Sequence, residues 1–250
     1  MLKNIVTIHS FRRSVGKSSL AANLAGLLAL EGRRVGLVDT DFQGASAHLF
    51  FGVNEADIAH TFNDYMLKKC DILQTVRDLS SQIGATGSGG LFLVPASTQI
   101  SDILQMLRVN MDLERYTTGL EKLEKTLDLD ILLVDTPAGL NENTLMAIAV
   151  SNTLVLVLRP DQQDFQGTAV IVDVARKLNT PAIQVVLNDT SEVINNEEVV
   201  LQLEQTYQCG KVTILEHSEE LLAMGSTQPF VLEYPHHLIS TRIKQLASQL

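Results

Sequence analysis

Continuous apolar runs alternate with helical segments along most of this chain, and that alternation limits the folds it can adopt. Such runs predict parallel strands covered by helices on both faces of a sheet. We expect strands at 4–9, 34–39, 91–97, 130–135, 152–160, 182–189 and 211–216, and helices at 17–30, 100–127, 165–178, 196–206 and 239–249. Residues 45–83 have a helical pattern with breaks, and 84–90 predict a surface loop. The simplest interpretation is one α/β domain over residues 1–250, a doubly wound, mostly parallel sheet flanked by helices.

Composition argues against several other classes of protein. The net charge is −10, and residues 151–250 carry 6 basic and 12 acidic side chains, so the composition gives no sign of a broad basic face for nucleic acid. Cys70 and Cys209 are far apart and match no metal-binding spacing, which favours two reduced thiols. No run reaches the roughly 18 apolar residues of a membrane-spanning helix. These features predict a cytoplasmic protein.

The stretch RRSVGKSS (12–19) lies between the first predicted strand and the first predicted helix. In that context the backbone amides of the loop and the helix N-terminus are placed to bind an anion such as a phosphate. Lys17 is predicted to reach the outer phosphates of a nucleotide, and the Ser18 hydroxyl to ligate Mg²⁺. We therefore predict a nucleotide cradle formed by Arg12, Arg13, Ser14, Val15, Gly16, Lys17, Ser18 and Ser19.

Two more predicted strands end in carboxylates. VDTDFQG (38–44) places Asp39 and Asp41 after the second strand, where they could hold a metal's water shell or orient an attacking water. LLVDTPAG (132–139) ends an apolar strand in Asp135, a usual way to hold Mg²⁺ beside a phosphate loop. The metal ligands predicted on this basis are Ser18, Asp39 and Asp135.

Together these motifs resemble those of the ParA/MinD family of deviant phosphate-loop ATPases. The family loop is KGGxGK[ST][ST]. VDTDFQG resembles the family's D-x-D-P-Q-G with Phe42 in place of proline, LLVDTPAGL matches its I-D-[TS]-P-[PA]-G, and LFLVPAS (91–97) is similar to its L-P-A-S strand. The resemblance covers nearly the whole chain. It implies a P-loop ATPase that binds ATP and Mg²⁺ and forms a homodimer with ATP sandwiched between the subunits.

The loop departs from the family pattern at three positions. The family's signature lysine precedes two glycines and contacts the phosphates of the partner subunit; here Arg12 stands at that position and Arg13-Ser14 replace the glycines. Arginine can grip phosphate through two parallel hydrogen bonds. Arg12 is the first candidate for the signature role, Arg13 the second, and a loop in which neither acts is the third. Because side chains replace the two glycines, we also expect strained backbone at Arg13 or Ser14. The loop resembles that of a subgroup of the family whose loop begins S-F-R.

The resemblance also implies roles for two residues elsewhere. The second aspartate of D-x-D is the family's hydrolytic residue, so Asp41 joins Lys17 and Arg12 as predicted catalytic residues. An asparagine at the end of a later strand contacts the adenine edge in the family, which places Asn188 at the base, although Asp189 follows it where the family usually has arginine. Arg159 ends another strand near the site and is a candidate either for phosphate binding or for an ordinary ion pair.

Three functions remain open on this sequence. The first is an ATPase, slow and stimulated by an activator or cargo-adaptor protein, whose ATP-bound dimer positions or partitions a cargo such as a DNA locus, protein compartment, division site or motility organelle. The second is a nucleotide-binding regulator with little hydrolysis. The third is an ATP-dependent metabolic enzyme of the same superfamily. The basic residues Arg176, Lys177 and Lys211 are candidates for non-specific DNA binding in a dimer, which would give a nucleoid location. The last helix lacks the basic face of a membrane anchor, so we do not expect membrane anchoring.

Overall fold

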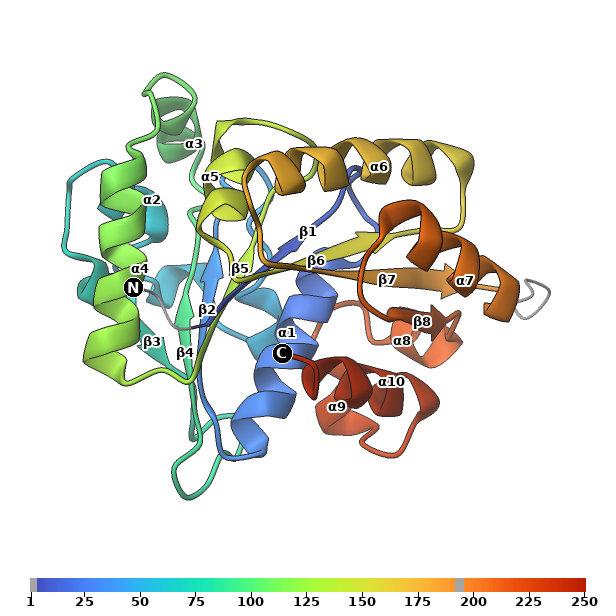
Figure 1. The fold of residues 1–250 in the computed structure, drawn as a ribbon. Helices are drawn as coiled ribbons and strands as arrows, with labels where there is room; N and C mark the ends of the chain where they lie inside the picture. The colour runs from blue at the N-terminus through green and yellow to red at the C-terminus, as the bar shows by residue number, and fades with distance from the viewer. Residues whose placement is uncertain (1–3, 192–195) are drawn as a thin grey trace.

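A computed structural model describes residues 4–191 and 196–250 and places all eight strands of this part of the chain in one sheet (Figure 1). The strand order is β3-β4-β2-β5-β1-β6-β7-β8, and only the short edge strand β3 runs antiparallel to its neighbour. The strands are β1 (Ile5–His9), β2 (Arg34–Asp39), β3 (Arg77–Asp78), β4 (Gly90–Val94), β5 (Ile131–Asp135), β6 (Thr153–Leu158), β7 (Ala182–Thr190) and β8 (Val212–Glu216). The predicted α/β class with a mostly parallel sheet is confirmed.

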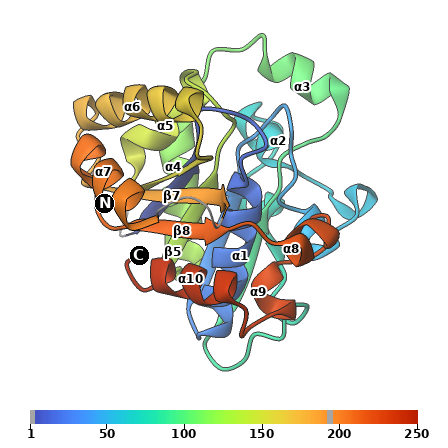
Figure 2. The same ribbon diagram turned by 90° about the vertical axis from the view of Figure 1, so that its right-hand side faces the viewer.

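Helices cover both faces of the sheet. They are α1 (Lys17–Leu30), α2 (Phe62–Met66), α3 (Ile100–Met106), α4 (Leu113–Leu127), α5 (Glu142–Val150), α6 (Gln162–Lys177), α7 (Asn196–Tyr207), α8 (Glu219–Ala223), α9 (Phe230–Glu233) and α10 (Leu238–Ala247). One apolar cluster packs α1, α9 and α10 against one face of the sheet. On the opposite face, a second cluster holds α2, α4 and α5, and a third holds α6 and α7. Figures 1 and 2 show these two layers, with α3 standing out from the body of the fold.

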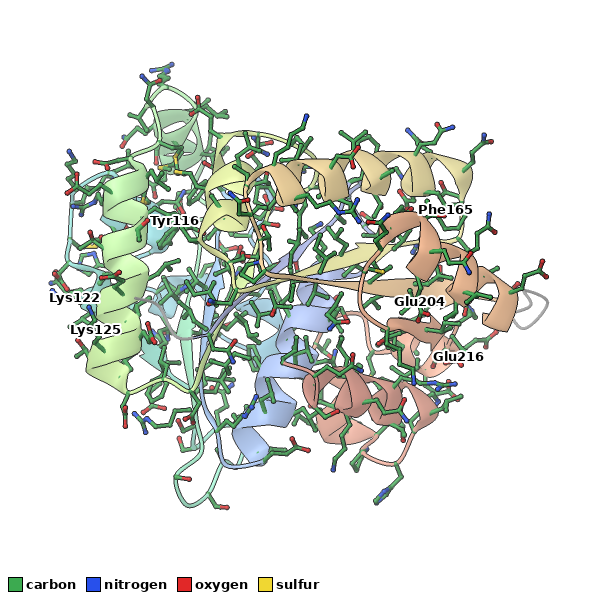
Figure 3. The ribbon with its side chains drawn as sticks, in the orientation of Figure 1. Tyr116, Lys122, Lys125, Phe165, Glu204 and Glu216 are labelled. Carbon is green, nitrogen blue, oxygen red and sulfur yellow. The ribbon has the colours of Figure 1, made fainter. Side chains whose placement is uncertain are left out.

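The strands carry the continuous apolar character that the sequence predicts. Every residue of β1 and β5 is buried, because helices pack on both of their faces. On the outer layer, α4 is amphipathic: Tyr116 points toward the sheet and is 1% exposed, whereas Lys122 and Lys125 project from the opposite side of the helix (Figure 3). Burial of such a stripe is the main stabilisation available to a helix of this length.

Several parts of the predicted element order are wrong. The single helix at 100–127 is two helices, because Asp112 accepts a hydrogen bond from the Arg115 amide and thereby caps a new helix, α4. Residues 45–83 form turns, short 3₁₀ segments, the five-residue helix α2 and the strand β3 rather than broken long helices. The strand predicted at 91–97 is β4, which ends at Val94. Helices α5, α8 and α9 were not predicted.

The last helix packs as part of the core. Ile239, Ile243 and Leu246 of α10 are buried in the cluster that contains α1, while Leu238 at its start is half-exposed. Within residues 4–191 and 196–250, no helix has the length and apolar character needed to cross a membrane.

The connections that leave β1 and β5 create the crevice in which the site lies. From β1 the chain passes through α1 to β2 on the far side of β5, whereas from β5 it passes through α5 to β6 on the far side of β1. The chain therefore departs in opposite directions from these two neighbouring strand ends, a point where doubly wound sheets bind ligands. The residues predicted at the ends of β1, β2 and β5 are brought together here.

Candidate nucleotide site

The loop after β1 ends at Gly16, which begins α1. Gly16 has φ 102, and a Cβ atom there would lie 2.5 Å from Asn188 Nδ2, so both the backbone conformation and the space require glycine. No side chain of the described residues caps α1, and its first backbone amides are left for a ligand. These amides and the positive end of the helix dipole make an anion site at the predicted position.

A cavity of about 520 Å³ opens over this helix end. Its walls include Arg13, Ser14, residues 16–19, Asp41 and Asn188 around the start of α1, and a segment around α8 beyond them. Figure 2 shows α8 beyond the ends of β7 and β8. The cavity therefore has a polar end suited to phosphates and a longer extension toward the segment after β8.

Lys17 lies inside this polar end rather than in solvent. It is 6% exposed, and burial lowers the pKa of its ammonium group, an effect that the nearby charge of Asp135 opposes. A buried ammonium group next to free amides is a strong attractor for phosphate oxygens, because little water competes for it. The structure thus brings Lys17 and the uncapped N-terminus of α1 together at this end of the cavity.

Asp39 and Asp135 are register partners on the adjacent strands β2 and β5, and both are fully buried. The carboxylate of Asp39 accepts hydrogen bonds from the amides of Asp41, Ser46 and Ala47. Burial nevertheless raises the pKa of Asp39 to about 6. Asp39 therefore fixes the loop that follows β2, and its predicted role as a metal ligand stays a prediction.

Asp135 is in a different situation. Within the described residues neither of its oxygens has a hydrogen-bond partner of good geometry. Burial, and then the charge of Asp39, raise the pKa of Asp135 to about 8, although the neighbouring Ser18 hydroxyl lowers it. An unsatisfied buried carboxylate beside a serine hydroxyl and a phosphate site has the hard oxygen donors that Mg²⁺ prefers. The residues present therefore fit a Mg²⁺ ion held by Ser18 and Asp135.

Asp41 lines the cavity across from the loop. Its amide donates to Asp39 Oδ1, and its own Oδ1 accepts from the Gln43 amide at 3.2 Å, so the side chain is held in place. His9 lies deeper, where its Nδ1 is 2.8 Å from Thr136 Oγ1; burial, and then Lys17, lower the pKa of His9 to about 3. His9 is therefore a neutral, enclosed side chain held by Thr136 beneath the site.

The two arginines of the loop have different environments. Arg12 forms ion pairs with Asp161 and, from its Nε at 2.6 Å, with Asp164, which is 1% exposed. It does not line the cavity. Arg13 does line it and donates to Gln43 Oε1 at 3.0 Å. Of the two candidates for the signature position, only Arg13 therefore faces the site in this structure.

Phe11 explains how the loop is attached to α6. Its ring lies so close to Gly167 that a Cβ atom at residue 167 would be 2.1 Å from it. Ser14 has φ 59, the strained left-handed conformation expected where the glycines are replaced. The first half of the loop is thus fastened to α6, and the second half carries the backbone strain next to the cavity.

Asn188 also lines the cavity, and its Nδ2 donates to the Val15 carbonyl at 2.8 Å, which ties β7 to the loop. Val15 itself is buried and offers only backbone groups. Asp189 follows with φ 61 and contacts Arg159 at 3.3 Å and His217 Nδ1 at 2.6 Å. The contacts among Arg159, Asp189 and His217 depend on three neighbouring strand ends, so no local pattern in the sequence indicates them.

Comparison with known proteins agrees with this geometry. A family model described as AAA domain matches residues 3–188. An uncharacterized ATP-binding protein of Methanocaldococcus jannaschii is 26% identical over 98% of this chain and 86% of its own length. The sporulation initiation inhibitor protein Soj of Bacillus subtilis is 26% identical over 69% of this chain and 64% of its own. The crystal structure of the cell division ATPase MinD of Pyrococcus furiosus superposes with a TM-score of 0.80 over 98% of this chain and 97% of that chain, at 21% identity.

Proposed function

Since this chain belongs to the ParA/MinD family of P-loop ATPases, we propose that it uses ATP binding and hydrolysis to switch between a homodimer and a monomer. The observation that carries the proposal is Asp135, a buried carboxylate without a good hydrogen-bond partner among the described residues, beside Lys17 and Ser18. Such a group is costly unless a cation completes its environment. Ser18 and Asp135 would hold the Mg²⁺ of a bound Mg²⁺–ATP complex, and the uncapped amides at the start of α1 would bind its phosphates.

The residues then have distinct roles. Lys17 binds the outer phosphate oxygens and stabilises the charge that develops on them. Ser18 and Asp135 hold Mg²⁺, which neutralises phosphate charge when bound. Asp41 orients the attacking water, and Asp39 supports it by fixing the loop after β2.

The arginines suggest how the dimer senses the nucleotide. Arg12 is engaged by two aspartates of its own chain, whereas Arg13 borders the cavity with one hydrogen bond to Gln43 among the described residues. We therefore assign to Arg13 the contact with the partner subunit's phosphates, which the sequence analysis gave first to Arg12. An arginine placed in trans would make turnover depend on dimerisation.

The cargo is proposed at the level of class. One relative acts in sporulation initiation and one structural neighbour is a cell division ATPase, by their names. A switch of this kind positions or partitions a cellular cargo through an activator or adaptor protein that binds one nucleotide state. The acidic charge of residues 151–250 makes a protein adaptor a better fit than direct, non-specific DNA binding.

Single-turnover hydrolysis with enzyme in excess over radiolabelled ATP tests the proposal against a binding module that does not hydrolyse. We expect Mg²⁺-dependent ADP formation, and a loss of about 100-fold or more in Asp41→Ala with nucleotide binding retained. Asp57→Ala changes an aspartate of a surface turn outside the cavity and serves as the control. ATP binding without measurable turnover in the wild type would support the regulatory module instead.

A further inference from the structure

Three strand ends assemble a charged cluster beside Asn188 at the wall of the cavity. Arg159 follows β6, Asp189 lies in β7 where the pairing with β8 shifts register, and His217 follows β8. Asp189 Oδ2 is 3.3 Å from Arg159 Nη2, and Asp189 Oδ1 is 2.6 Å from His217 Nδ1. Both oxygens of this carboxylate are therefore engaged, although Asp189 and Arg159 line the cavity.

The neighbouring amide sets the chemistry of this part of the cavity. Asn188 uses Nδ2 to hold the Val15 carbonyl, which leaves its carbonyl oxygen as an acceptor for an exocyclic amine. Adenine presents one amine beside ring acceptors and suits this arrangement. Guanine presents a ring N–H and an amine side by side, and two adjacent donors are best matched by a free carboxylate.

A second carboxylate at the cavity wall is also paired. Glu216, at the end of β8 (Figure 3), lies 3.5 Å from Arg242 Nη2 of α10. A cation of the protein thus faces each of these two carboxylates, although Glu216 Oε2 is buried without a hydrogen-bond partner among the described residues. A guanine ring that used Asp189 as its acceptor would have to displace Arg159, and donors left unpaired in a buried site are strongly disfavoured.

We propose that Arg159 sets the base selectivity of this site by occupying Asp189, so that adenine nucleotides are accepted and guanine nucleotides are rejected. His217 holds the second oxygen of the same carboxylate, so loss of Arg159 frees Asp189 Oδ2 to accept from one of the two guanine donors. The inference rests on the proposed nucleotide-binding function and identifies what excludes the competing base. In this account Asp189 is a latent guanine acceptor that the ion pair keeps unavailable.

Competition binding tests this directly. Unlabelled ATP or GTP, each with Mg²⁺, displaces a fluorescent ATP analogue from wild type, Arg159→Ala, the double variant Arg159→Ala/Asp189→Asn and the control Arg108→Ala. Arg108 is an exposed arginine after α3 and does not line the cavity. We expect wild type and the control to prefer ATP, the ratio of GTP to ATP affinity to rise about 10-fold or more in Arg159→Ala, and the double variant to lose that rise.

The outcomes separate the inference from the function beneath it. Wild type that binds neither nucleotide contradicts the proposed function. Wild type that binds ATP, with an unchanged affinity ratio in Arg159→Ala or with a rise that persists in the double variant, overturns the role of Arg159 and Asp189 alone. If Arg159→Ala does not fold, as judged by circular dichroism, Arg159→Gln removes the same charge with less loss of volume and is measured in its place.

Discussion

The two adjacent arginines of the loop should differ sharply in their effect on stability. Arg12→Ala removes the cation that pairs with Asp164, a carboxylate that is only 1% exposed. Asp164 then keeps the hydrogen bond from the Arg159 backbone amide, at 2.9 Å. Removing one partner of a buried ion pair costs about 3–5 kcal/mol. Because 34% of the Arg12 side chain is exposed, we reduce this to about 2–3 kcal/mol, and the more exposed Asp161 adds less than about 1 kcal/mol. Arg13→Ala should stay within about 0.5 kcal/mol of wild type.

Urea unfolding followed by circular dichroism, without nucleotide, measures both variants under the same conditions. In a chain of this size the loss for Arg12→Ala corresponds to a melting temperature lower by roughly 5–10 °C. Arg13→Ala is the matched control, since it removes the same side chain one residue away. Equal unfolding free energies for the two variants, or an Arg12→Ala protein as stable as wild type, would refute the claim that α6 holds Arg12.

Three further predictions follow from individual contacts. Gly167→Ala should lower the unfolding free energy by about 1–3 kcal/mol, because its Cβ would lie 2.1 Å from the Phe11 ring; an unchanged urea midpoint would show that the loop does not pack there. Asp135→Asn should raise the melting temperature of the ligand-free protein and abolish Mg²⁺-dependent stabilisation by ATP, and calorimetry that finds the Mg²⁺ effect intact contradicts the metal assignment. The pKa of Asp135 is raised from 3.8 to about 8 in the folded state, so the unfolding free energy measured in EDTA should fall as pH rises between these values. Asp135→Asn should flatten this pH dependence, and parallel profiles for the variant and wild type would argue against a raised pKa at Asp135.

Much of the phosphate end was predictable because its signals are local. A strand, a loop with Gly16-Lys17-Ser18 and an apolar helix lie together in the sequence, and Asp135 ends a run of apolar residues that could only be a buried strand. Parallel strands then bring such ends together without further information. The strain at Ser14 was equally local, since a glycine position had been filled by a residue with a side chain.

The remaining features depend on contacts between distant residues. The attachment of Phe11 and Arg12 to α6 joins positions about 150 residues apart, and the pattern D-x-x-D at residues 161–164 was its only visible signal. The cluster of Arg159, Asp189 and His217 requires the pairing of β6, β7 and β8. The helices between residues 217 and 234 were missed because they are four or five residues long, too short for an amphipathic period to appear.

Solution mass by light scattering tests the central claim, the nucleotide-dependent switch, most directly. The measurement compares ADP–Mg²⁺ with ATP–Mg²⁺, using Asp41→Ala to hold the ATP state and Arg13→Ala in the same background to remove the proposed contact between subunits. We predict a monomer with ADP, a doubled mass with ATP, and a weakened ATP dimer without Arg13. A protein that binds ATP and stays a monomer, or one that is a dimer with either nucleotide, would contradict the switch.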